Sequence, residues 1–322
     1  MKNFYLIVFL IILNILNIFS QTKDEIINKV LSELNQNNFG TEFWVSIPPA
    51  LIENNSNYSN KVRFCIYPLM NGKVSLNILH KSYKEEKVVE AGKLYEFTLN
   101  PEIAQIYLKD PQSKPLSNTI FNRSGIQLIS DIPFSLYVIV DYLSSFEGFL
   151  AYPVSRLGKN FIVSTHTDPV NYYPLYNSLP AMISLLSPFD ENEVTFTMGG
   201  ENNSITSDGL TAGKKITRTL NKGDIWLISS DGRNMGLSGS GINSTKPLSV
   251  ISANQYTNIP SNYKNGNFII EMETPTTTWS NNFLIGKIYN RKYSPIVKIF
   301  AKENNTNVFI NNFPVGTIKN CV

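Results

Sequence analysis

The stretch "GTEFWVS" at residues 40–46 returns 118 positions later as "GKNFIVS" at residues 158–164. Both spell Gly-x-x-Phe-x-Val-Ser, in which Phe and Val are two positions apart and therefore point to the same side of a β-strand. The glycine suits a tight turn that opens each strand. The repetition predicts two copies of one β unit along the chain.

Further matches recur in the same order and support this interpretation. They lie at offsets of 116–121 residues: "AGKLYEFTLN" at 91–100 with "AGKKITRTLN" at 212–221, Pro68 with Pro188, and "SGI" at 124–126 with "SGI" at 240–242. One such match could be chance, but several in register indicate an internal repeat of about 120 residues.

The pattern from Phe39 onward is typical of strands. Short runs rich in Val, Ile, Phe, Tyr and Thr, such as "KVSLNIL" and "DIWLISS", alternate with turns rich in Gly, Asn, Asp, Ser and Pro. No helical pattern separates these runs, which disfavours parallel βαβ winding. We therefore predict an all-β fold of tandem antiparallel β-sandwich-like units, preceded by one short N-terminal helix.

The amino terminus has the layout of a secretory signal. "MKNFYLIVFLIILNILNIFSQ" holds one Lys and then an apolar run of 16 residues that contains two Asn, which is shorter than the roughly 20 residues needed to span a membrane. We expect residues 1–20 to be a cleaved signal peptide, so that the mature protein is secreted or at the cell surface without a membrane span. Residues 21–38 contain helical spacing and predict a short amphipathic helix or linker.

The repeat sets the expected domain boundaries. We assign residues 39–157 to β unit 1, residues 158–278 to β unit 2, and residues 279–322 to the start of a third unit. We expect this incomplete unit to pack on unit 2. Its strand edge could also pair with another chain, which would give self-association.

Composition narrows the function classes. Charged residues make up only 16% of the chain, the net charge is +3, and no Lys/Arg cluster provides a footprint for nucleic acid. Only Cys65 and Cys321 are present, so a disulfide scaffold is not expected, and Cys65 is predicted to be a small buried hydrophobe. The three tryptophans, Trp44, Trp226 and Trp279, are predicted core anchors.

Motifs for catalysis or metal binding are not found in the sequence. The two histidines, His80 and His166, fall at dissimilar points of the two units, and no metal, nucleotide or nucleophile motif occurs in its required context. The acidic stretches "FDENE" at 189–193 and "SDGRN" at 230–234 suit hairpin turns. We expect no catalytic residue, no metal and no cofactor.

A family resemblance covers residues 40–320. The segments "GTEFWVSIPP", "EGFLAYPVSRLGKNFIVSTH", "GKKITRTLNKGDIWLISSDGRNMGLSGSGINSTKPLSVISANQY" and "ETPTTTWSNNFLIGKI" follow one another in an order that resembles the IgGFc-binding protein N-terminal domain family, in its bacterial secreted form. The resemblance implies an extracellular β-rich module for binding or adhesion. It carries over no catalytic residue and does not imply that this chain binds Fc.

The expected binding surface is a tyrosine-rich segment. "NYYPLYN" at 171–177 places Tyr172, Tyr173 and Tyr176 around a proline between two strand regions. Tyrosines on a loop give good adhesive contacts because each offers a large rigid face with a polar tip. Packing across the junction between the units is the alternative use of these side chains.

The sequence thus predicts a non-enzymatic extracellular protein that acts in adhesion or in binding a macromolecule, such as a glycan or glycoprotein. One alternative is a structural subunit of an extracellular assembly. Another is a glycan-active enzyme, which would need two carboxylates about 5–10 Å apart in one cleft.

Overall fold

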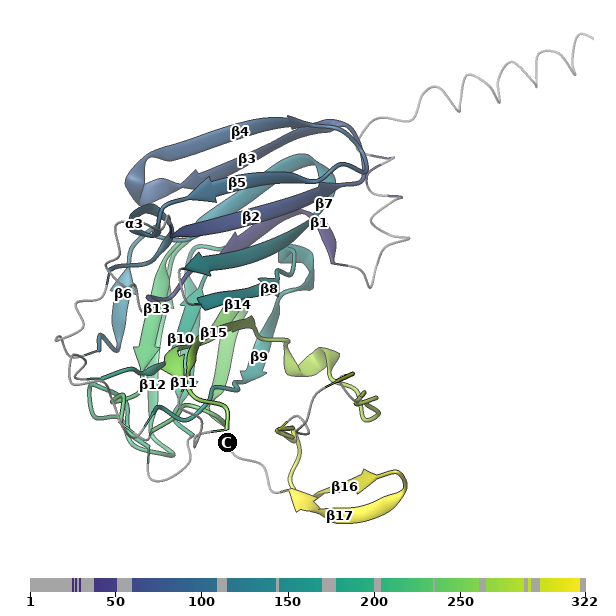
Figure 1. The fold of residues 1–322 in the computed structure, drawn as a ribbon. Helices are drawn as coiled ribbons and strands as arrows, with labels where there is room; N and C mark the ends of the chain where they lie inside the picture. Colours follow the sequence, from purple (N-terminus) through teal and green to yellow (C-terminus); the bar gives the residue numbers. More distant parts are fainter. Residues whose placement is uncertain are drawn as a thin grey trace, which may run out of the picture.

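The computed structural model is an all-β protein in which every pair of named strands is antiparallel (Figure 1). The predicted fold class is confirmed. The structure describes residues 25, 27, 29, 38–50, 60–108, 115–142, 145–169, 178–199, 204–233, 235–260, 265–286, 289–290 and 296–318.

The first sheet is built around one long strand, β7 (Ile126–Tyr142). On each edge of β7, two strands pair with it one after the other. On one of these sides, two further strands extend the sheet. The other six strands are β1 (Phe39–Val45), β2 (Lys61–Pro68), β3 (Gly72–Ile78), β4 (Tyr83–Val89), β5 (Tyr95–Leu99) and β8 (Ser145–Leu150).

The partner of β7 changes partway along this strand. β3 pairs with the first part of β7 and β2 with the second part, and β4 and β5 lie outside β3 and β2. Where the partner changes, the connection between β2 and β3 is bonded to β7 through Leu69 N–H, which donates to Pro133 O at 3.0 Å. The connection between β4 and β5 is bonded to the end of β2 through Gly92 N–H, which donates to Pro68 O at 2.9 Å. Gly92 has φ +73°, a conformation that favours glycine.

The second sheet has the same connections around another long strand, β14 (Gly241–Thr257). Judged by their hydrogen-bonded partners, its strands take the places of β1, β2, β3, β4, β5 and β8 in that order. They are β9 (Gly158–Ile162), β10 (Ala181–Leu186), β11 (Asn192–Thr197), β12 (Lys215–Leu220), β13 (Ile225–Ser229) and β15 (Asn267–Met272). An eighth strand, β6 (Thr119–Phe121), comes from between β5 and β7 in the sequence and pairs with β13.

One of the predicted matches aligns strands that are not equivalent. Gly223, with φ +86°, donates to Ser187 O at 2.8 Å and so takes the place of Gly92. The segment 91–100 leads into β5, whereas 212–221 leads into β12, the counterpart of β4. The match failed because β11 ends at Thr197 and β12 begins only at Lys215, whereas β3 and β4 are separated only by the 3-10 turn η1 (Leu79–Lys81) and Ser82.

The opening Gly-x-x-Phe motifs do occupy matching strands, but the glycines have a different role from the predicted one. A Cβ on Gly40 would lie 2.3 Å from the Cβ of Pro153, and a Cβ on Gly158 would lie 2.2 Å from that of Pro275. Each proline precedes a 3-10 turn, η2 (Val154–Arg156) or η3 (Thr276–Thr278). Glycine is therefore required for close packing against a proline rather than for a turn.

The two sheets share a core. One buried cluster joins the interior of the first sheet to one face of the second, including Leu227 of β13, Ile251 of β14 and Met272 of β15. A separate cluster fills the interior of the second sheet around Trp226. The second sheet is thus covered on both faces, whereas the first sheet is covered on one.

Outside the two sheets, the described chain contains short elements. Glu25, Ile27 and Lys29 are helical, and the rest of the predicted helix in 21–38 lies outside the described residues, apart from Asn38. The helix α3 (Pro101–Ala104) lies between the strands, and a separate hairpin consists of β16 (Thr306–Ile310) and β17 (Phe313–Ile318). Within the described residues, no helix has the length and apolar character needed to cross a membrane.

Two side-chain predictions are wrong. Cys65 lies on the outer face of β2 and is half-buried, because the core positions of this strand are its neighbours Phe64 and Ile66. Trp279 is only half-buried and donates through Nε1 to Thr274 O at 3.3 Å, since it follows η3 at the margin of the second sheet. Trp44 and Trp226 are fully buried, as predicted.

Candidate functional site

The predicted binding tyrosines, Tyr172, Tyr173 and Tyr176, lie outside the described residues. The structure describes the chain on either side of them, up to Pro169 and again from Ser178.

The base of this tyrosine segment is held by a buried carboxylate. Asp168 Oδ1 accepts a hydrogen bond from Ala181 N–H at 2.6 Å, and Asp168 Oδ2 accepts one from Ser230 Oγ at 2.8 Å. Asp168 N–H in turn donates to Met235 O at 2.7 Å. The described residues on the two sides of this segment, Asp168 and Ala181, are therefore bonded to each other beside the second sheet.

Burial raises the pKa of the Asp168 carboxyl to about 7, against the opposing effect of its hydrogen bonds from Ser230, Ala181, Met235 and Gly232. A second carboxyl, Glu273, follows β15 and accepts hydrogen bonds from Ser164 N–H and Ser252 Oγ. Burial raises its pKa to about 7 as well. Both groups belong to the second sheet and its loops.

The outer face of the first sheet carries exposed aromatic side chains. Tyr67 on β2, Tyr137 on β7 and Phe146 on β8 are 42%, 52% and 60% exposed. Such a set on neighbouring strands is unusual for a face in contact with water, since large aromatic side chains are enriched at interfaces. Sequence analysis missed this face, although "VRFCIYP", "FSLYVIV" and "SFEGFL" show these residues at the positions that alternate with the core.

Arg63 lies in the same face and is braced by its neighbours. Its Nη1 lies 3.3 Å from Glu96 Oε2, its Nε lies 3.6 Å from Asp141 Oδ2, and its guanidinium lies 5.7 Å from the centre of the Phe146 ring. The guanidinium is thus held in one place by two carboxylates and a ring. Arginine and tyrosine are enriched among the residues that dominate binding interfaces.

The equivalent face of the second sheet is closed. In the first sheet, a row of cross-strand neighbours runs Leu150, Tyr137, Cys65 and Glu96; in the second, the residues in the same places are Met272, Ile251, Ser184 and Leu227. All four residues of the second row are buried. Ser184 Oγ is 2.6 Å from Ser46 Oγ, a hydrogen-bonding distance, so this row faces the segment after β1.

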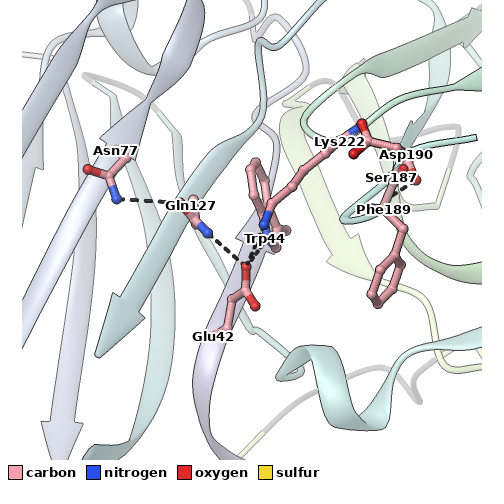
Figure 2. A network of polar contacts seen from close by, with 8 residues as sticks. All are labelled: Glu42, Trp44, Asn77, Gln127, Ser187, Phe189, Asp190 and Lys222. Carbon is pink, nitrogen blue, oxygen red and sulfur yellow. Dashed lines mark hydrogen bonds and ion pairs between the residues drawn. The ribbon is translucent and has the colours of Figure 1, made fainter. Parts of the chain in front are cut away.

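A polar network fixes the junction between the sheets (Figure 2). Glu42 Oε1 accepts hydrogen bonds from Trp44 Nε1 at 2.8 Å and from Gln127 Nε2 at 2.7 Å. Lys222 extends from the second sheet, with Nζ 3.8 Å from Glu42 Oε1 and 5.7 Å from the centre of the Trp44 ring. Asn77 Nδ2 donates to Gln127 Oε1 at 3.4 Å. The network orients the buried Trp44 against the second sheet.

Gly223 and Asp224, from the segment "GKKITRTLNKGDIW" that carries part of the family resemblance, also lie at this junction. Gly223 O accepts a hydrogen bond from Gly125 N–H at 2.9 Å, and Asp224 Oδ1 accepts one from Arg123 N–H at 2.9 Å. A Cβ on Gly223 would lie 3.3 Å from the Trp44 ring. These residues therefore join the two sheets.

Metal and histidine chemistry is not evident in the part of the chain that the structure describes. No group of three or more His, Cys, Asp or Glu side chains in it could hold a metal ion. Burial lowers the pKa of His166 to about 4, with a further lowering effect of Lys298, and burial lowers that of His80. His166 is therefore uncharged near neutral pH.

A family model described as IgGFc binding protein matches residues 147–320, which is more than half of the 322 residues. The chain belongs to the IgGFc-binding protein family. This IgGFc-binding region begins in β8 and runs through β17, so it contains the second sheet apart from β6, together with the β16–β17 hairpin. The family is of a binding type, and its members are typically extracellular.

No curated protein matches the chain. No solved structure matches it either. The N-terminal-domain type and the bacterial form stay predictions.

Proposed function

We propose that this chain is a secreted or cell-surface protein that binds an extracellular macromolecule, a glycan or a glycoprotein, and acts in adhesion. The observation that carries the proposal is the open outer face of the first sheet, which presents the exposed Tyr67, Tyr137 and Phe146 and an Arg63 held beside the Phe146 ring. Membership of the IgGFc-binding family supports a binding role rather than catalysis.

The physical argument is one of preorganisation. β2, β7 and β8 are hydrogen-bonded side by side, so their side chains need little ordering when a ligand arrives. Tyr137 offers a ring face and a hydroxyl, which suit both a sugar ring and a protein surface. Arg63, Glu96 and Asp141 supply hydrogen bonds around the rings.

The tyrosine segment is a second proposed contact. Tyr172, Tyr173 and Tyr176 would be presented from the base closed by Asp168, at the second sheet. Two tandem β copies, a signal peptide at residues 1–20 and export of the mature chain are part of the same proposal. The shared connectivity of the two sheets supports the repeat.

The test is a binding screen with the chain from Gln21 onward. Immobilised glycans and extracellular glycoproteins, with immunoglobulin G as one of them, are probed with the natural chain and with the double variant Tyr137→Ala, Phe146→Ala. We expect the double variant to lose at least tenfold in affinity for any ligand found, because central aromatic residues dominate such interfaces.

A control is Val88→Ala on β4, an apolar residue that is 72% exposed and lies on a strand paired with β3, not with the strands that carry Tyr67, Tyr137 and Phe146. Its affinity should equal that of the natural chain. Binding that is unchanged in the double variant would contradict the proposed face.

A further inference from the structure

The hairpin β16–β17 stands apart from both sheets. Among the described strands, its two strands pair only with each other, and the turn between them has Asn311 and Asn312 at φ +50° and +67°. Positive φ at both central residues is the geometry that matches the twist of a two-residue hairpin. A two-stranded ribbon of this kind is only marginally stable alone in water.

In the two large sheets, each comparable pair of strands is hydrogen-bonded to a third, long strand. β3 and β4 are joined through β3 to the long strand β7, and β11 and β12 are joined through β11 to β14. The corresponding edge of β16 has no strand beside it in the described part of the chain. The hairpin belongs to the region matched by the family model, which ends at residue 320.

Charge distinguishes this hairpin from the other edges. Every described edge strand of five or more residues in the two sheets contains a charged residue, namely Glu42 in β1, Lys84 and three neighbours in β4, Glu96 in β5, Glu147 in β8, Lys159 in β9, Lys215 and Arg218 in β12, and Glu271 in β15. The remaining described edge strand, β6, has three residues. Charges and short length are the usual protection against pairing with another chain.

Residues 306–318, "TNVFINNFPVGTI", contain no charge. β17 is interrupted by Pro314, which cannot donate to a ladder. β16 has neither a proline nor a charge, and its Phe309 and Ile310 are 59% and 55% exposed. β16 is therefore the unprotected edge.

We propose that β16 pairs with β16 of a second copy of this chain, antiparallel and about a two-fold axis near Val308. A strand that pairs with itself in this way brings each residue close to its own copy or to a near neighbour, so a charged strand would suffer like-charge repulsion. The uncharged sequence of β16 avoids that repulsion, which an edge made for a different partner would not require. The interface joins β17, β16 and the two strands of the second copy into one four-stranded sheet.

The exposed side chains fit this arrangement. Val308 lies at the centre of the strand, and the apolar Phe309 and Ile310 lie next to it. Pairing adds main-chain hydrogen bonds and covers these side chains, which is the chemistry of β-strand addition.

The experiment measures the mass of the full mature chain by sedimentation over a range of concentrations. The natural chain should form a discrete dimer. Val308→Lys and Val308→Glu should each give monomers, because like charges then meet near the axis. An equal mixture of the two variants should restore the dimer, because opposite charges then face each other.

Val315→Lys is the control, since Val315 is 54% exposed on β17 and lies off the β16 edge; this variant should dimerise as the natural chain does. Circular dichroism of each variant checks that the sheets remain folded. A natural chain that stays monomeric, forms only large heterogeneous aggregates, or dimerises equally well with Val308→Lys would overturn the proposal, and so would a mixture that fails to pair. Ligand binding at Tyr137 is measured separately and is not expected to change.

Discussion

The outer faces of the two sheets share one pattern of strand pairing and differ in what covers them. In the first sheet the cross-strand neighbours Tyr137, Cys65 and Glu96 are accessible, whereas Ile251, Ser184 and Leu227 in the same places of the second sheet are buried against the first. Strand connections therefore do not decide which face is open. The side chains at the outward positions decide it.

The strongest test of the difference between the two faces exchanges the residue types at equivalent positions. Leu227→Glu places at the buried position the residue that its counterpart Glu96 carries at the surface. We expect a loss of about 5 kcal/mol in the free energy of unfolding, or failure to fold, because the buried carboxylate has no partner. Urea unfolding measures the loss.

The reverse exchange, Glu96→Leu, is the control. It removes an ion pair with Arg63 that is partly exposed, so the free energy of unfolding should change by less than about 1 kcal/mol. Equal losses for the two variants would show that both faces are covered to the same degree.

Trp44 tests the junction through which the first sheet covers the second. Trp44→Ala should lower the free energy of unfolding by about 3–4 kcal/mol, because it leaves a cavity between Gly125 and Gly223. Trp279→Ala, at a half-buried tryptophan that follows η3, should cost much less. A small loss at Trp44 would mean that the two sheets do not depend on this contact.

The pH dependence of stability should come from the second sheet and its loops. The folded-state pKa of Glu273 is raised from 4.5 to about 7, so the folded protein holds this proton more tightly than the unfolded chain does. The resulting stability is complete below about pH 4.5 and is lost as the pH rises toward 7. Each tenfold difference in proton affinity between the folded and unfolded states corresponds to about 1.4 kcal/mol.

Glu273→Gln should flatten this decline, because it keeps an oxygen for Ser164 and Ser252 without a titrating proton. Glu271, Tyr152 and Arg156 remain nearby in both proteins. Urea unfolding at several pH values between about 4.5 and 7.5 measures the slope. An unchanged slope in the variant would assign the effect to another group, with Asp168 as the first candidate.

The smallest expected effect is at Cys65. Cys65→Ser introduces the residue found at the equivalent position 184, and it should change the free energy of unfolding by less than about 0.5 kcal/mol because the thiol is half-buried on the open face. Ser184→Ala should cost about 1 kcal/mol, since it leaves the buried Ser46 hydroxyl without its partner. A larger loss at Cys65 than at Ser184 would reverse the assignment of the faces.

Much of the fold could be predicted from side-chain alternation. "KVRFCIY" alternates and forms a strand with one covered face, whereas "AMISLL" and "DIWLISS" are apolar almost throughout and form strands covered on both faces. The antiparallel all-β class follows from such runs. Which segment covers the second sheet could not be read from them, because that contact joins Ser46 to Ser184, far apart in the sequence.

The alignment of the two halves and the site were harder to predict. The longer interval between the end of β11 and the start of β12 conceals the equivalence of Gly92 and Gly223, and an identical "AGK" tripeptide favours a different alignment. Tyr137 and Phe146 lie far apart in sequence from Tyr67, so only strand pairing brings them together. The tyrosine segment stands out in the sequence because its residues are adjacent.

The most direct test of the account compares thiol labelling on the two faces in the folded protein. In a Cys65→Ser, Cys321→Ser background, Tyr137→Cys and Ile251→Cys place one thiol at equivalent positions. The account predicts rapid labelling at position 137, near the rate in the unfolded chain, and labelling slower by several orders of magnitude at position 251. Similar rates at the two positions would contradict it.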